Sequence, residues 1–216
     1  MEILNYRPPM EPYLEIVSQD DDILVLNKPS GLLSVPGKEH ADCLQARAQR
    51  VFPTATVVHR LDMATSGLMV MALNKPAHRH ISKQFELRET AKTYQAVVFD
   101  TMQQDSGEIN LPLICDWPNR PKQMVDHARG KKALTHWRVL ERSNNTTRVE
   151  LKPVTGRSHQ LRVHMLSMQH PIIGDNLYAH DQALEMASRL NLHAITLSFR
   201  HPVSEQTLRF ESQVPF

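Results

Sequence analysis

The sequence is poor in two residue types on which many familiar functional sites depend. It has only seven glycines and two cysteines among its 216 residues. It contains no Walker-type phosphate loop and no dinucleotide-binding fingerprint, because both motifs require closely spaced glycines. Cys43 and Cys115 lie far apart in apolar surroundings, which argues against a disulfide framework and favours a reducing compartment.

Metal-binding and nucleophile motifs are also missing. The histidines have no zinc-type spacing, and no cysteine pair could assist them. No serine or cysteine lies in a nucleophile-elbow context. We therefore expect neither a metal ion nor an organic cofactor.

Long apolar runs and a strong charge of one sign are absent as well. No run approaches the ~20 apolar residues of a membrane span, and no basic start with an apolar centre resembles a signal peptide. We expect a cytoplasmic protein without a membrane partner. The formal net charge is only +2, so any anion-binding surface must come from local clusters of basic residues.

What the chain does contain is a succession of strand-like segments with few helices. Helical spacing or capping predicts helices at 44–52, at 75–88 after the capping residue Asn74, and from the cap Ser158 to Gln169. Alternating or continuous apolar patterns predict strands at 16–19, 23–26, 68–73, 94–99, 108–113, 134–140, 148–151, 192–199 and 207–210. The pattern predicts an α+β fold with a mixed, mainly antiparallel sheet and flanking helices. We expect an extended arm over residues 1–14 and one compact domain over 15–216, which a cleft could divide into two lobes.

The most informative segment runs from His59 to Gly67. It places Asp62 two residues after Arg60, in a turn of small residues directly before a buried apolar run. A carboxylate held there can act as nucleophile, general base or stabiliser of a cation without a cofactor. This motif alone leaves the three roles open.

A second cluster gathers polar side chains at the start of the helix expected from Ser158. Its members are Arg157, His159, Gln160 and Arg162. A helix N-terminus favours phosphate or carboxylate groups, whereas the simpler interpretation is a solvated basic face. Arg162 is the candidate partner of Asp62, because a neighbouring arginine keeps a carboxylate ionised.

Aromatic residues stand beside basic residues in two further places. Tyr94 follows a basic segment at the start of a strand, where it is either a half-buried sheet residue or a ring that stacks on a base. Trp117, Arg120 and Lys122 lie on a proline-rich loop. Such a loop suits base stacking and phosphate contacts, or it is a stiffened crossover.

Taken together, these motifs resemble the RluA-type pseudouridine synthase family over nearly the whole chain. The matching segments, in order, are Asn27–Leu32, His59–Gly67, Lys92–Tyr94, Gly156–Arg162, His170–Asp175 and Leu192–Ala194. The resemblance implies a cofactor-free isomerase that converts uridine in RNA to pseudouridine, with a central RNA-binding cleft in the sheet. It matches Asp62 to the catalytic acid, Tyr94 to the base-stacking residue and Arg162 to the arginine that pairs with the acid. Arg60 matches an arginine that can enter the RNA helix as the base leaves.

We further expect His59, Arg157, His159, Gln160 and the loop residues Trp117, Arg120 and Lys122 to bind RNA. The short region before the first strand implies that no N-terminal RNA-binding domain of S4 type is present. This form and the 115–122 loop are similar to the family member that acts on large-subunit rRNA and on the anticodon stem-loop of tRNA. We expect a monomer. The alternatives are an inactive RNA-binding module and a base-releasing glycosidase, although glycosidases usually use two carboxylates.

Overall fold

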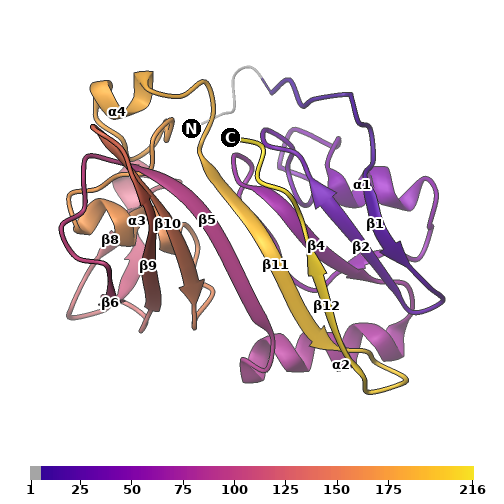
Figure 1. The fold of residues 1–216 in the computed structure, drawn as a ribbon. Coiled ribbons are helices and arrows are strands. Elements are labelled where there is room, and N and C mark those ends of the chain that lie inside the picture. The colour runs from indigo at the N-terminus through magenta and orange to yellow at the C-terminus, as the bar shows by residue number, and fades with distance from the viewer. Residues whose placement is uncertain (1–5) are drawn as a thin grey trace. The chain divides into compact units, whose positions relative to one another are not determined.

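The computed structural model describes residues 6–216, which divide into two compact units (Figure 1). The Asp62 unit comprises residues 6–92 and 194–215, and the Arg162 unit comprises residues 93–193 with Phe216. The chain passes from one unit to the other within two strands, β5 and β11. No helix in the described part of the chain is long and apolar enough to cross a membrane.

The Asp62 unit is built on strands in the order β1-β2-β4-β11, with β12 paired to β11 and β3 paired to β4. Its elements are β1 (Ile16–Gln19), β2 (Ile23–Lys28), α1 (Leu44–Gln49), β3 (Thr56–Val57), β4 (Ser66–Ala72), α2 (Lys75–Leu87), β11 (Leu192–Arg200) and β12 (Thr207–Glu211). The β1–β2, β2–β4 and β11–β12 pairings are antiparallel. In Figure 1 the long helix α2 runs beneath these strands.

The buried apolar run is the central strand of this unit, as the sequence predicts. Every residue of β4 is buried, and Leu68 and Val70 share a core with Ile81 of α2. The α2 helix begins at the predicted cap, where the Asn74 side chain accepts a hydrogen bond from the amide of Ala77. Burial of this strand places its first residues, and the turn before it, against a rigid core.

The Arg162 unit carries strands in the order β5-β10-β9-β6 and a separate hairpin, β7-β8. Its elements are β5 (Ala91–Phe99), β6 (Ser106–Asn110), β7 (Leu113–Cys115), the 3-10 turn η1 (Trp117–Asn119), β8 (Gln123–Val125), β9 (Leu134–Arg142), β10 (Thr146–Pro153), α3 (Gln160–Ser167) and α4 (Asp181–Glu185). The β5–β10, β9–β10, β6–β9 and β7–β8 pairings are all antiparallel. The predicted α+β class with a mainly antiparallel sheet is confirmed.

Two predictions of local structure are wrong in this unit, and two short elements were not predicted. The expected strand 108–113 is two strands, β6 and β7, and the sequence signalled neither β8 nor the short helix α4. The third helix begins at Gln160 and ends at Ser167, and Ser158 does not cap it. Its N-cap is His159 in the left-handed region, with φ of 53° and no side-chain cap. Contacts with distant strands, and not a local capping signal, set the start of this helix.

The predicted N-terminal arm falls partly outside the described residues, which begin at Tyr6. From residue 6 to 15 the chain has no helix or strand. The Tyr6 hydroxyl donates to the carbonyl of Asp42, and the buried Arg47 donates to the carbonyls of Pro9 and Tyr13. This segment is therefore held against the body of the Asp62 unit.

Candidate active site and nucleic-acid interface

The Asp62 turn lies between β3 and β4, and the Asp62 side chain is partly exposed. The turn closes on itself, because the amide of Thr65 donates to the carbonyl of Asp62 over 3.1 Å. Gly67 follows with φ of +115°, and a Cβ there would come within 2.4–2.8 Å of the backbone of Ala194. Only glycine fits this close approach, so Gly67 fixes the point at which the turn enters the core strand.

A second segment, residues 28–34, holds the backbone of this turn from the other side. Lys28 is fully buried, and its Nζ donates to the carbonyls of Met63, Leu32 and Pro29 over 3.0, 2.7 and 2.9 Å. Further bonds run from Gly31 N to Met63 O, from Ser30 Oγ to Ala64 O and from Ser34 Oγ to Leu61 O, with Leu61 N donating back to Ser34 Oγ. The carboxylate of Asp62 is thus presented by a backbone whose carbonyls on both sides are fixed.

Lys28 supports the Asp62 turn, and the sequence assigned it no role. Its segment, Asn27–Leu32, was marked by the family resemblance without a role for the lysine, since a lysine after a strand is most often exposed. The signal that could have found it is the burial of the preceding strand Ile23–Leu26, which carries Lys28 inward. The partner carbonyl of Met63 lies 35 residues away, so the interaction exists only in the folded chain.

We expect Lys28→Met to lower both the free energy of unfolding and the enzymatic turnover. The methionine fills a similar volume, but the carbonyl of Leu32 loses this donor and that of Met63 keeps only the bond from the amide of Gly31. A buried polar group left unsatisfied costs about 1–3 kcal/mol. Urea denaturation measures the loss of stability. The exposed Lys83→Met is the matched control and should change stability by less than about 0.5 kcal/mol. Equal stability of the two variants would contradict the positioning role of Lys28.

His59 and Arg60, beside Asp62, face different environments. Arg60 is exposed and available to a polyanion. The His59 ring stacks on Phe85 at 4.4 Å between centroids, and its Nε2 accepts a hydrogen bond from the amide of Val70. Burial, followed by the charge of Lys92, lowers the pKa of His59 to about 3. These contacts favour an internal role for the neutral His59 ring over the expected RNA contact.

Arg162 forms a buried ion pair in its own unit. Its Nε donates to Oδ2 of Asp175 over 2.7 Å and its Nη2 to Oδ1 over 2.6 Å, with the two side chains 3% and 1% exposed. This two-pronged geometry fixes the plane of the guanidinium. The expected pairing of Arg162 with Asp62 joins residues of different units and stays a prediction. Sequence reasoning missed Asp175 as a partner, although it lies in a motif that the family resemblance had marked.

Tyr94 occupies the same unit, in strand β5. Its side chain is partly buried, and it lies opposite Leu151 of β10 in the antiparallel register. Both of the earlier interpretations, a sheet residue and a stacking ring, are compatible with this position. Its role in base stacking stays a prediction.

Gln160 uses its side chain to hold the loop before α3. Its Oε1 accepts from the Thr155 hydroxyl and from the amide of Arg157, and its Nε2 donates to Thr135 and to the carbonyl of Leu134. The residue is buried. These bonds explain why α3 starts at Gln160, and they favour an internal role over the expected RNA contact. Arg157, in contrast, is exposed.

The predicted RNA-binding loop is the tip of the β7-β8 hairpin. We call residues 113–125 the arm, which is a different segment from the predicted N-terminal arm. Trp117 is 65% exposed, and the Arg120 guanidinium lies 4.6 Å above its ring. Lys122, the residue directly before β8, is partly exposed. The arm therefore presents an aromatic face and two cations to solvent, which is the combination that suits a single-stranded nucleic acid.

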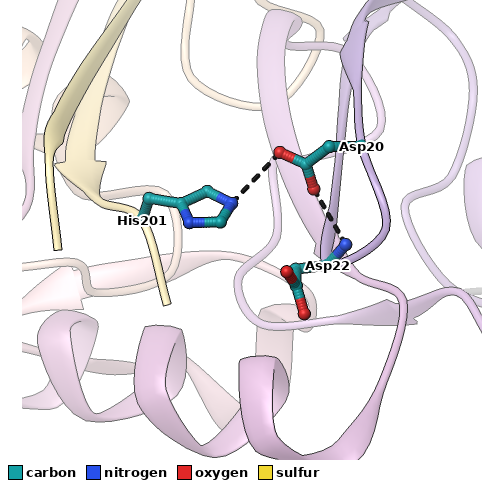
Figure 2. A group of neighbouring side chains, drawn as sticks. All are labelled: Asp20, Asp22 and His201. Atoms are coloured by element: carbon teal, nitrogen blue, oxygen red, sulfur yellow. Dashed lines mark hydrogen bonds and ion pairs between the residues drawn. The ribbon is translucent and has the colours of Figure 1, made fainter. Parts of the chain in front are cut away.

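One group of metal-ligating types occurs in the described chain, namely Asp20, Asp22 and His201 (Figure 2). Nδ1 of His201 accepts hydrogen bonds from the amides of Val203 and Ser204, so its Nε2 carries the hydrogen that points to Oδ2 of Asp20 at 3.1 Å. A metal needs the lone pair of that nitrogen, which this tautomer does not offer. Asp20 Oδ1 also accepts from the amides of Asp22 and Ile23. The group is best explained as a set of hydrogen bonds that holds two surface turns together.

Comparison with known proteins gives consistent results over the length of the chain. A family model described as RNA pseudouridylate synthase matches residues 22–167. Two similar relatives are the dual-specificity RNA pseudouridine synthases RluA of Haemophilus influenzae, 51% identical over 100% of both chains, and of Escherichia coli strain K12, 54% identical over 98% of both.

Solved structures agree with these matches. The human RNA pseudouridylate synthase domain containing 1 superimposes with a TM-score of 0.82 and 29% identity, covering 97% of this chain and 87% of that one. The human RNA pseudouridylate synthase domain containing 4 gives 0.74 and 26%, covering 93% and 88%.

Proposed function

This chain belongs to the RNA pseudouridylate synthase family, and we propose that it isomerises uridines in RNA stem-loops to pseudouridine with Asp62 as the catalytic acid. The observation that carries the proposal is the Asp62 turn itself. Its backbone is pinned by the buried Lys28 and by Ser30 and Ser34, while the Asp62 side chain keeps access to solvent. Such rigidity is what a carboxylate needs if it is to meet a sugar carbon in one orientation.

The proposed substrates are large-subunit rRNA and the anticodon stem-loop of tRNA. The two bacterial relatives are named dual-specificity enzymes, and they match this chain over 98% or more of their own length. RNA is accordingly the partner. The expected monomeric state, the cytoplasmic location and the lack of a metal or organic cofactor are further parts of this proposal.

The reaction breaks the N1–C1′ bond of uridine and joins C5 to C1′. Neither atom can be reached in a stacked base, so the uridine must first leave the stem. In this proposal the base packs on Tyr94, and Asp62 either adds to C1′ or removes the C2′ proton to give a glycal. The base then turns and C5 bonds to C1′, as the Asp62–C1′ bond breaks on the first route or as the proton returns to C2′ on the second. N1 gains a proton and the C5 proton leaves. In this proposal Arg162 favours the carboxylate form of Asp62 before it reacts.

Energies indicate what else the site must supply. Extruding a base costs a few kcal/mol, and stacking it on an aromatic ring returns roughly 1–3 kcal/mol. These terms nearly cancel, so net affinity must come from contacts between basic side chains and phosphates. The exposed candidates are Arg60, Arg157 and Arg120, with the partly exposed Lys122 as a further cation and Trp117 as a stacking surface. RNA binding should therefore weaken as salt increases.

Product analysis tests the proposed function. The protein is incubated with a stem-loop RNA that carries tritium at C5 of its uridines, and nucleosides are separated after digestion. Isomerisation releases the C5 tritium to water and leaves a C-linked nucleoside in the chain. Release of free uracil would indicate a base-releasing glycosidase instead, and RNA binding without either product would indicate an inactive binding module.

The Tyr94 hydroxyl is proposed as a relay for the C5 proton. Tyr94→Phe keeps the stacking ring and removes only the hydroxyl, so turnover should fall by about 100-fold or more if the group transfers a proton. Binding of the same stem-loop, measured by fluorescence anisotropy, should change by less than about threefold because stacking is retained. Near-normal turnover of this variant would remove the hydroxyl from the chemistry and leave Tyr94 as a stacking residue.

A further inference from the structure

Tyr178 lies where α3 meets the base of the arm. Its side chain is only 9% exposed and forms a core cluster with Leu113 of β7 and Val163 of α3, with Val125 of β8 packed against it. Strands β7 and β8 are the two sides of the arm, whereas α3 carries Arg162. One ring therefore contacts both of the features that the proposed function assigns to RNA binding and to catalysis in this unit.

The Tyr178 hydroxyl adds a polar connection to this packing. Its oxygen accepts a hydrogen bond from the amide of Gln123, the first residue of β8, over 2.8 Å. The same oxygen lies 2.6 Å from Nδ1 of His159, the residue that precedes α3. Gln123 and His159 are thus joined through a single atom, although the two residues are 36 positions apart in the chain.

The remainder of Tyr178 supports Arg162. The Arg162 guanidinium lies 5.0 Å from the centre of the ring, a cation–π distance. The amide of Tyr178 donates to Oδ1 of Asp175, the oxygen that also accepts from Nη2 of Arg162. The ring and the backbone of Tyr178 therefore act on Arg162, while the hydroxyl acts on the arm.

We propose that Tyr178 is a positioning residue that places both the RNA-binding arm, through its hydroxyl, and Arg162, through its ring. The proposal rests on the proposed function, in which the arm contacts RNA and Arg162 assists Asp62. In this proposal the hydroxyl and the ring of Tyr178 make separate contributions. The hydroxyl sets where Trp117 and Arg120 meet the RNA and so governs KM, whereas the ring holds Arg162 and so governs kcat.

Amide hydrogen exchange tests the connection without reference to activity. In Tyr178→Phe the Gln123 amide loses its acceptor, so peptides covering 123–125 should exchange at least about fivefold faster, while β9 and β10 stay protected. Tyr6→Phe is the matched control, because it removes a hydroxyl that accepts from the amide of Leu33 in the other unit. It should leave exchange at 123–125 unchanged. Unchanged exchange in Tyr178→Phe would overturn the proposal.

Steady-state kinetics test the division between hydroxyl and ring. Tyr178→Phe should raise KM for a stem-loop RNA by about fivefold, the equivalent of one neutral hydrogen bond, with kcat within about twofold of the unmodified protein. Tyr178→Leu, which also removes the ring, should lower kcat. An unchanged KM in Tyr178→Phe overturns the proposal even if exchange increases, and so does a loss confined to kcat.

A double-variant cycle tests whether the Tyr178 hydroxyl acts through the arm or whether its loss loosens the whole unit. With Trp117→Ala the arm has lost its stacking surface, so adding Tyr178→Phe should raise KM by less than about twofold more. Full additivity of the two changes would overturn the proposal.

If the unmodified protein forms no pseudouridine, the proposed function fails, and the same cycle is then carried out on stem-loop affinity. Non-additive losses of affinity would support action of the Tyr178 hydroxyl through the arm, and additive or absent losses would overturn the proposal.

Discussion

Asp62→Asn should bind a stem-loop RNA with nearly unchanged affinity and form no measurable pseudouridine. The substitution keeps the size of the side chain and the turn around it, because the bonds from Lys28, Ser30 and Ser34 are made to the backbone and not to the carboxylate. An amide can neither add to C1′ nor accept the C2′ proton. Loss of a positioned acid–base group alone reduces rate by about 10²–10⁴-fold, and loss of a nucleophile reduces it further.

The measurement compares tritium release with RNA affinity for the same protein preparation. Asp21→Asn is the matched control, since Asp21 is an exposed aspartate at another turn of the same unit. It should leave both quantities within about twofold, as substitutions at exposed sites usually do. Appreciable turnover by Asp62→Asn would remove this carboxylate from the chemistry and, with it, the central part of the proposed mechanism.

Arg162→Ala should lose both stability and turnover, and the two losses have different origins. The substitution leaves Asp175 as an uncompensated buried carboxylate, which costs about 3–5 kcal/mol. Turnover should fall by about 100-fold or more, because the proposed ionised state of Asp62 depends on this guanidinium. Affinity for RNA should fall much less, since Arg162 is only 3% exposed.

A double variant distinguishes structural loss from catalytic loss. Arg162→Met with Asp175→Asn removes both charges and keeps the volume of the pair, so urea denaturation should show most of the stability restored. Turnover should nevertheless stay as low as in Arg162→Ala. Recovery of turnover together with stability would show that Arg162 serves only to neutralise Asp175.

Arg162→Lys tests the geometry of the pair. Lysine keeps the positive charge but cannot form the two parallel bonds that Nε and Nη2 make to Asp175. We expect intermediate stability and a turnover closer to that of Arg162→Ala than to that of the unmodified protein. A fully active lysine variant would indicate that charge, and not orientation, is what the site requires.

Local sequence patterns were sufficient for much of the framework. A continuous apolar run before a helix cap predicted the buried strand β4 and the start of α2, because burial and capping depend on residues within a few positions of each other. The short segments were harder. The β7-β8 hairpin and α4 have three to five residues per element, too few for a periodic signal to stand out.

The start of α3 shows why local capping signals fail where tertiary hydrogen bonds contribute more. Ser158 is a good capping residue by type, yet the helix begins after His159, which adopts φ of 53°. The Gln160 side chain fixes the preceding loop to strand β9 through Leu134 and Thr135, some 25 residues earlier. A buried amide with four bonds outweighs a single cap, which contributes about 1 kcal/mol.

The sequence by itself determined the candidate chemistry of this protein: an acid in a rigid turn, an arginine at a helix start and an aromatic loop beside basic residues. The tertiary structure decided how those groups are held, through Lys28 under the Asp62 turn, Asp175 against Arg162 and Tyr178 between α3 and the arm. The reason is physical. A polar group that is buried must find its partners wherever the folded chain brings them, and the partners here lie 13 to 55 residues away.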